Sequence, residues 1–186
     1  GELTVPRIAE RAGGTPWHPH HIAERYGLFV IILLGEGVLG SSQALASAIE
    51  QLGWGDGLAV VAPASIGLLL AVWWAYFLAP YGDRLAAHRQ LGWWFGYWHY
   101  VLFGSLAAIG AGLAIVAEAI AHPEEVTVVR AAAAVAVPLV VFLACKFVIH
   151  ARMWPRDRAY GGLLAAAVVA IGGVVAAAGA GLAMQW

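Results

Sequence analysis

Long apolar runs separated by short polar segments dominate the chain. Five windows have about twenty predominantly apolar residues, the length that an α-helix needs to cross a hydrocarbon core of about 30 Å. They cover residues 26–48, 58–79, 93–117, 131–150 and 160–183. Turn-forming residues occupy the gaps, for example Pro80, Gly82 and Asp83 between the second and third windows. The pattern predicts an all-α, polytopic membrane protein with about five transmembrane helices.

Composition supports this fold class and excludes others. Hydrophobic residues make up 62% of the chain and charged residues only 11%, which leaves too few polar side chains to cover a soluble globule. The net charge is −1 and the basic residues are scattered, so no nucleic-acid-binding surface is indicated. We therefore expect the lipid bilayer as a partner, no nucleic acid and no cofactor.

The arginines predict an orientation. If the five helices alternate in direction, one side of the membrane receives all the arginines except Arg130, and an excess of positive charge marks the cytoplasmic side. The arginines on that side are Arg7, Arg11, Arg25, Arg84, Arg89, Arg152, Arg156 and Arg158. We expect residues 1–25 to form a cytoplasmic or interfacial N-terminal segment and residues 26–186 to form the transmembrane domain.

A polar stripe follows one face of the first window. At 100° per residue, its members fall within an arc of about 120°. They are His21, Glu24, Arg25, Gly35, Glu36, Ser42, Gln43 and Glu50. Glu36 lies about 15 Å beyond the cytoplasmic edge, close to the bilayer midplane. Because a charge exposed to lipid there costs at least about 2.5 to 3.5 kcal/mol, we expect its carboxyl group to face other helices or water.

Two more ionisable residues lie at a compatible depth. Counted at 1.5 Å per residue, His99 lies about 10 Å and Lys146 about 7 Å from the cytoplasmic edge, so either could approach Glu36. For Lys146 we prefer the alternative that its long side chain extends to the lipid headgroups. For His99, a hydrogen bond across a helix interface is an equal alternative to a functional role.

Three histidines before the first window raise the question of a metal site. His18, His20 and His21 are followed by Glu24 one turn later. Neither of the common zinc motifs with paired histidines occurs, and no second ligand cluster is apparent. We expect no metal ligand and no catalytic residue, and keep an intramembrane metal-dependent enzyme only as a minor alternative.

The last window consists almost entirely of alanine, valine and glycine. It includes Gly172, Gly173, Gly179 and Gly181. Small residues allow helix backbones to approach closely in membranes, so the pattern predicts close packing of this helix.

Three segments of the sequence resemble the bacterial low temperature requirement A family. The first is the long run at residues 21–36, HIAERYGLFVIILLGE. The second is WWAYF at residues 73–77, and the third is YWH at residues 97–99. The resemblance implies a membrane protein, and it carries over Glu24, Arg25, Glu36 and His99 by position.

The chain departs from the family pattern in two respects. Leu78 stands where the family usually continues with an aspartate, so no role can be transferred to an acid there. Family members usually have a further membrane half before the signature, so we expect this chain to correspond to a C-terminal half. The family name implies a requirement for growth in the cold and no particular biochemical activity.

The favoured function is that of a transport or channel-like protein of the bacterial inner membrane. The path for a proton, an ion or a small polar solute is expected to involve His21, Glu24, Arg25, Glu36, His99 and Lys146. The alternative is a structural or adaptor membrane module without transport activity. In either case the sequence favours a protein that is not an enzyme, and it leaves open assembly with the missing N-terminal half or as a homo-oligomer.

Overall fold

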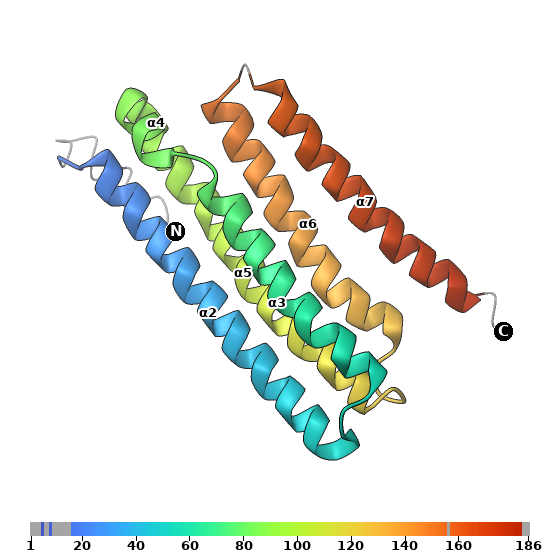
Figure 1. Ribbon diagram of the computed structural model, residues 1–186. Helices are drawn as coiled ribbons and strands as arrows, with labels where there is room; N and C mark the ends of the chain where they lie inside the picture. The colour runs from blue at the N-terminus through green and yellow to red at the C-terminus, as the bar shows by residue number, and fades with distance from the viewer. Residues whose placement is uncertain (1–4, 6–7, 9–15, 156, 184–186) are drawn as a thin grey trace.

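Helices account for the regular structure of the described chain. The computed structural model describes residues 5, 8, 16–155 and 157–183. Five long helices run side by side: α2 (Pro19–Leu52), α3 (Asp56–Phe77), α5 (Gly92–Ala121), α6 (Val128–Met153) and α7 (Arg158–Ala183) (Figure 1). The short α4 (Tyr81–Ala87) and a 3₁₀ helix (Arg89–Leu91) connect α3 to α5. Within the described residues no strand occurs, and the predicted all-α fold class is confirmed.

The helices are long and apolar enough for a membrane protein. Among the described residues, four stretches meet both conditions for crossing a bilayer: Pro19–Leu52, Gly57–Ala87, Arg89–Ala121 and Val128–Met153. The fifth long helix, α7, has 26 residues and is apolar over Ala159–Gly173. The first helix begins earlier than its apolar window, at Pro19, because proline fits the first turn of a helix, where its missing N–H removes no hydrogen bond.

The gap between the second and third windows contains more structure than its turn-forming residues indicated. Helix α4 packs against the start of α2, where Gly82 lies so close to His20 that an added Cβ would be 2.6 Å from the imidazole Nδ1. The Arg84 guanidinium donates to the carbonyl of Met153 at the end of α6 and lies 5.8 Å from the Trp154 ring. Helix α4 therefore ties α2 to α6.

This region forms one end of the bundle, which we call the arginine end. It contains the start of α2, the α3–α5 connection and the α6–α7 turn, which lie together in Figure 1. Its described arginines are Arg25, Arg84, Arg89, Arg152 and Arg158, the first residue of α7. Arg130 lies near the start of α6, at the opposite end. The arginines are therefore segregated in space as the sequence predicted.

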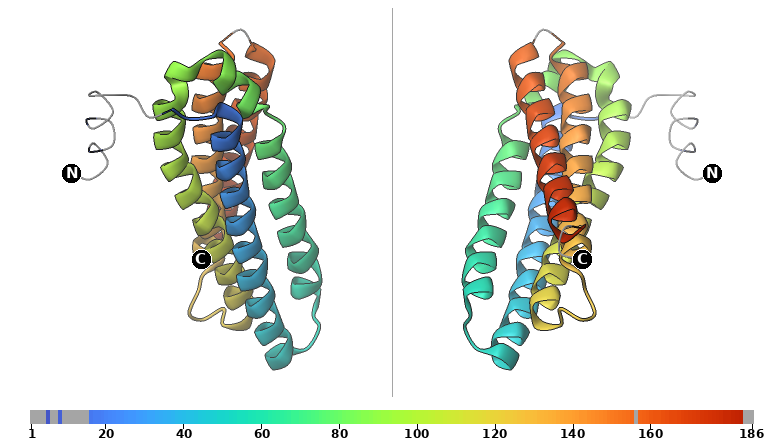
Figure 2. Two further views of the ribbon diagram at one scale, coloured as in Figure 1. Left: turned by 90° about the vertical axis from the view of Figure 1, so that its left-hand side faces the viewer. Right: turned by 90° about the vertical axis from the view of Figure 1, so that its right-hand side faces the viewer.

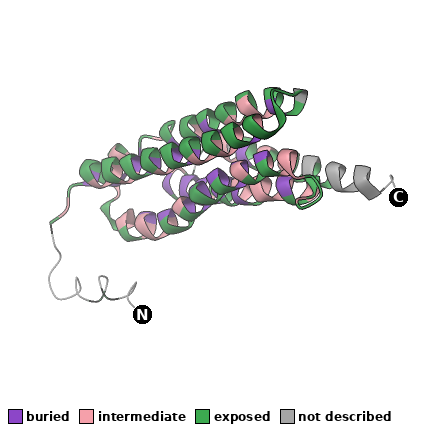
Figure 3. Ribbon diagram, turned by 90° about the horizontal axis from the view of Figure 1, so that it is seen from below, coloured by how far each residue is buried: buried purple, intermediate pink, exposed green. Residues whose placement is uncertain are grey.

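Helix α5 occupies the centre of the bundle. It packs against α2 on one side and α6 on the other, while α3 packs mainly against α2 at the edge (Figure 2). The buried side chains Phe95, Leu102, Leu106 and Ile109 on α5 have at most 1% of their surface exposed. In Figure 3, buried residues lie mostly between the helices and exposed residues on their outer faces.

Glycines on α2 and α5 bring the central helices close together. A Cβ added to Gly110 would lie 2.8 Å from the Cα of Gly37, so the two backbones are in contact. A Cβ added to Gly112 would lie 2.3 Å from the carbonyl oxygen of Ala134 on α6. That carbonyl has no helical donor because Pro138 lacks an N–H. Helix α5 thus approaches α6 at the carbonyl that the proline leaves free.

Gly172 and Gly173 of the last window do not have the predicted role in the described chain. A Cβ added to Gly172 or Gly173 would meet no atom within 4 Å. Gly179 and Gly181 belong to the part of α7 whose side-chain surroundings lie outside the described residues. The close approaches occur instead between α2, α5 and α6, since those helices have neighbours on two sides.

Two glycines of α5 provide a matched test of this packing. Gly112→Ala is expected to destabilise the protein by about 1 to 3 kcal/mol, because the new methyl group overlaps the α6 backbone. Gly104→Ala is the control, since a Cβ there meets no atom within 4 Å and alanine favours the helix by about 1 kcal/mol. Thermal unfolding of both purified variants in detergent measures the difference. Equal stability of the two variants would contradict the α5–α6 contact.

Candidate functional site

His99 lies at the centre of the bundle, on α5, with 0% of its surface exposed. Its Nδ1 is 2.7 Å from the carbonyl oxygen of Phe95 and its Nε2 is 3.1 Å from the hydroxyl of Tyr76 on α3. A carbonyl oxygen can only accept, so Nδ1 carries the hydrogen. In the neutral ring, Nε2 then accepts from the Tyr76 hydroxyl, and both ring nitrogens are satisfied.

Aromatic rings enclose this imidazole. The ring of Tyr26 on α2 meets it edge-on at 4.9 Å between centroids, and the rings of Phe95 and Phe103 lie at 4.1 and 5.4 Å. Tyr81 on α4 adds a fourth ring at 6.2 Å. His99 is therefore held in a fixed orientation by two hydrogen bonds and a shell of aromatic side chains.

Lys146 on α6 is also fully buried, with 0% exposure. Its ammonium nitrogen lies 2.5 Å from the Tyr81 hydroxyl and 3.5 Å from the backbone carbonyl of Tyr76. The same nitrogen lies near the rings of Tyr81, Tyr76 and Tyr160, at 4.9, 5.6 and 5.8 Å from their centroids. Rings at such distances attract a cation through their quadrupole. Tyrosines from three helices thus surround the amine.

The preferred prediction for Lys146 is wrong. Its side chain points to Tyr81 in the interior and does not extend toward the headgroups, because the tyrosines supply an acceptor and ring faces inside the bundle. No carboxylate of a described side chain forms an ion pair with it. Lys146 is therefore a buried amine with neutral partners.

Tyr76 links the two buried basic residues. Its hydroxyl binds His99, its backbone carbonyl accepts from Lys146, and its ring lies 5.5 Å from that of Tyr81. We refer to His99, Lys146, Tyr76 and Tyr81 as the His99–Lys146 cluster. It combines one imidazole, one amine and two phenols, groups that can each exchange protons.

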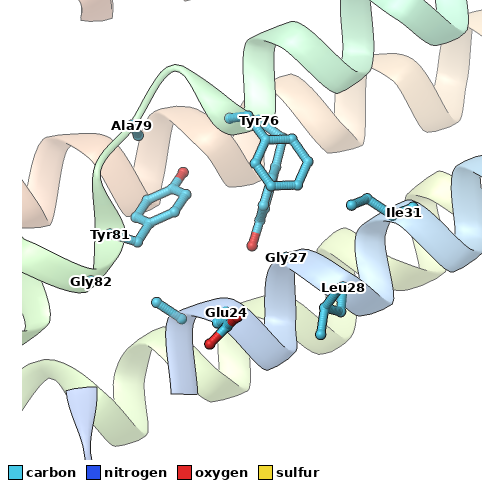
Figure 4. A pocket seen from close by; sticks show the side chains of 10 residues that line it. Glu24, Gly27, Leu28, Ile31, Tyr76, Ala79, Tyr81 and Gly82 are labelled. Atoms are coloured by element: carbon cyan, nitrogen blue, oxygen red, sulfur yellow. The ribbon is translucent and has the colours of Figure 1, made fainter. Parts of the chain in front are cut away.

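A pocket of about 190 Å³ reaches this cluster from between α2 and the α3–α4 segment (Figure 4). Tyr76 and Tyr81 stand on one side of it and Glu24 on the other, as Figure 4 shows. The lining residues are Ala23, Glu24, Gly27, Leu28, Ile31, Tyr76, Phe77, Ala79, Tyr81 and Gly82. The wall is mostly apolar, with one carboxylate and two phenols as its polar groups.

The polar stripe of α2 faces outward. All eight of its residues are exposed, including Glu36, while the opposite face of α2 buries Val30, Leu34 and Gly37. Gly37 packs against Gly110 of α5, so a glycine of α2 faces the bundle at this point. Of the two environments expected for Glu36, other helices or water, the described helices of the chain do not supply the first.

The structure does not bring Glu36 to either predicted partner. Tyr26 is the α2 residue whose ring meets His99, and Glu36 lies ten residues further along the helix, about 15 Å at the helical rise. Of the predicted path residues, Glu24 lines the pocket, and His99 and Lys146 belong to the cluster behind it. His21 and Arg25 are exposed at the arginine end.

The N-terminal histidines do not form a metal site with the residues that the structure describes. The rings of His18 and His20 lie 5.8 Å apart, and the Nε2 of His20 is 3.7 Å from the carboxylate of Asp83 on α4. No group of three or more histidine, cysteine or acidic side chains suited to a metal ion occurs in the described part. The metal-dependent alternative therefore has no ligand set there.

The tyrosines are site residues that the sequence did not predict. Tyr81 and Tyr160 lie outside or at the edge of the apolar windows, and Tyr76 belongs to a segment that carries only the family resemblance. A signal was present, because Lys146 is the only lysine of the chain and sits within an apolar window. A buried amine needs acceptors, and tyrosines at similar depth are the side chains that could supply them.

The three segments that carry the family resemblance converge in space. Tyr26 from the first segment, Tyr76 from the second and His99 from the third meet at the imidazole ring. Segments far apart in the sequence thus build one site.

Comparison with known proteins gives one match. The family described as bacterial low temperature requirement A protein (LtrA) matches residues 1–185, nearly the whole chain. Neither the curated proteins nor the solved structures include a match to this chain. The match extends over all five long helices and the three segments that meet at His99, and the chain belongs to the bacterial low temperature requirement A family.

Proposed function

We propose that this integral membrane protein is transport or channel-like, and that the His99–Lys146 cluster and its pocket handle a proton, an ion or a small polar solute. The observation that carries the proposal is Lys146, a fully buried amine in a membrane helix with tyrosines as partners and no ion pair to a described carboxylate. Ionisable residues in membrane helices are costly and mark pathways or binding sites.

The free-energy cost of burying a charge argues against a purely structural role for Lys146. A charge at the centre of a membrane helix costs at least about 2.5 to 3.5 kcal/mol, whereas a hydrogen-bonded pair of neutral side chains could join α4 and α6 for less. Neutral partners also leave the amine free to gain or lose a proton without breaking an ion pair. A group that changes charge next to a pocket suits coupled movement of a proton or solute.

The pocket supports an approach from the arginine end. Glu24 is exposed and lines the pocket, while Tyr76 and Tyr81 separate the pocket from His99 and Lys146. In the proposal, Glu24 attracts a proton or cation, with His21 and Arg25 nearby on α2 setting the local charge. The two tyrosines then pass protons or orient the solute through their hydroxyl groups.

Glu36 lies outside the His99–Lys146 cluster, and its proposed role is at an interface. Its carboxyl group lies on the outer face of α2, where lipid exposure is unfavourable, so we propose that another protein surface or water covers it. A second copy of the chain or a further membrane half could provide that surface. This outward face is also the observation that favours the second candidate function, a structural or adaptor module that joins membrane partners.

Proton flux tests the role of the cluster. Pyranine-loaded liposomes containing the purified protein, under an imposed pH gradient with valinomycin and potassium for charge balance, are expected to show flux above empty liposomes. Lys146→Met and Tyr81→Phe should each lower that flux by about tenfold or more, because they remove the amine and its acceptor.

Tyr100→Phe is the matched control, since Tyr100 is 61% exposed on the outer side of α5. Gel filtration establishes that each variant is folded before flux is compared. Native flux in folded Lys146→Met would contradict the proposed role of the cluster for protons. A native protein without proton flux would restrict the proposal to another ion or solute.

Glu36→Leu separates assembly from folding. Because the carboxyl group points away from the chain's own helices, this change should alter the unfolding free energy of the single chain by no more than about 0.5 kcal/mol. It should instead change the oligomers trapped by crosslinking in native membranes. A large loss of single-chain stability would show that Glu36 has a partner within the chain.

The orientation can be measured directly. We propose that the protein lies in the bacterial inner membrane with the arginine end in the cytoplasm, because basic residues favour that side. In a Cys145→Ser background, a cysteine at Gly55 should react with an impermeant maleimide added outside intact cells, and one at Pro155 should react only after lysis. The reverse labelling pattern would overturn this orientation.

A further inference from the structure

His150, one helical turn beyond Lys146, joins the buried site to the surface of the arginine end. It is 7% exposed, and its Nε2 lies 3.1 Å from the Oδ2 of Asp157 in the α6–α7 turn. Its ring stacks on Trp154 at 5.0 Å and lies 4.0 Å from that of Tyr160. Asp157 has 44% of its side chain exposed. A hydrogen bond therefore connects this buried imidazole to a carboxylate in contact with solvent.

The second nitrogen of His150 has no partner. If Asp157 is ionised its carboxylate can only accept, so Nε2 carries the hydrogen and Nδ1 keeps a free lone pair. Nδ1 is the only buried side-chain nitrogen or oxygen, among those the structure describes, without a hydrogen bond. Buried polar atoms normally have partners, and an exception calls for an explanation.

His150 and the buried amine share one face of α6, because residues four apart on a helix are neighbours. Both side chains contact the same ring, since the Lys146 nitrogen is 5.8 Å from the Tyr160 centroid and the His150 ring is 4.0 Å from it. An acceptor without a donor therefore lies one helical turn from an amine whose described hydrogen bonds use two of its three possible protons.

We propose that His150 and Asp157 form a proton relay between Lys146 and water at the arginine end. The relay deepens the proposed function, since it supplies protons to the amine of the same cluster. It runs through α6 and the α6–α7 turn, whereas the pocket lies between α2 and the α3–α4 segment. The cluster then has one approach for solute and another for protons.

The proton steps balance. In the outward direction, the Lys146 ammonium gives a proton to Nδ1 of His150, directly or through one water molecule, and becomes a neutral amine. The resulting imidazolium loses its Nε2 proton to the Asp157 carboxylate, which releases it to bulk water. The imidazole is left with its hydrogen on Nδ1, and the inward transfer along the same atoms restores the starting state.

The charged and titratable groups around His150 favour proton transfer from Lys146 toward Asp157. Lys146 faces Tyr76 on α3, Tyr81 on α4 and Tyr160 on α7, and His99 on α5 lies behind Tyr76. Asp157 is the acid that contacts His150. On the α4 side, Arg84 lies over Trp154, against which His150 stacks. The imidazolium formed in transit thus has a carboxylate on its exit side.

The single lysine makes the relay measurable. Protein labelled with ¹⁵N-lysine and reconstituted in lipid bilayers gives one side-chain nitrogen signal, so exchange of its protons with water can be followed by solid-state NMR at fixed pH. His150→Phe keeps an aromatic ring but removes both nitrogens. It should slow exchange by about a hundredfold, the lower end of what a positioned proton-transfer group contributes. Asp157→Asn should slow it in the same direction.

His122→Phe is the matched control. His122 also lies close to acids, at 3.7 Å from Glu118 and from Glu124, but it follows α5 at the opposite end of the bundle. Its replacement should leave Lys146 exchange at the native rate. If His150→Phe does not fold, Asp157→Asn decides, because it changes one atom of a partly exposed side chain.

The relay and the transport proposal can fail separately. Native exchange rates in folded His150→Phe and Asp157→Asn would overturn the relay, whatever flux the native protein shows. Slowed exchange in both, in a protein that carries no proton flux, would keep the relay and remove protons from the proposed transport function.

Discussion

A buried amine in the hydrocarbon interior of a membrane can form hydrogen bonds only with groups of the protein. Lys146 is the residue that this constraint affects most. Its nitrogen is fully buried, and α3, α4 and α7 each bring a tyrosine to it. The short helix α4 is held in position because Gly82 packs on α2 and Arg84 binds the end of α6. The contacts made by this one amine therefore join four helices at the arginine end.

The same constraint explains why the site is built from phenols. A tyrosine offers a hydroxyl for hydrogen bonding and a ring face for a cation, while most of its surface remains apolar. Tyr76 uses both the side chain and the backbone, and so holds His99 and Lys146 in one cluster without an acid. Neutral partners hold the basic groups in place while leaving their charge able to change.

The outer face of α2 presents the opposite situation. Glu36 has no partner among the described side chains of the other helices, because Gly37 and Leu34 are the residues that α2 turns inward. Close contact between the α2 and α5 backbones needs glycine on that side, which leaves the polar stripe outside. A carboxyl group at such depth calls for cover, so the surface that completes this protein in the membrane should lie along α2.

The sequence by itself determined the number and type of the long helices, because a helix must be about twenty apolar residues long to cross a bilayer, and that length is visible in the chain. It also placed His99 and Lys146 within apolar windows. Only the tertiary structure decided that Lys146 is buried, that Glu36 points outward and that His150 binds Asp157. Those facts depend on how each helix is rotated and which helices adjoin, and rotation is set by contacts such as Gly37 with Gly110 that no single segment encodes.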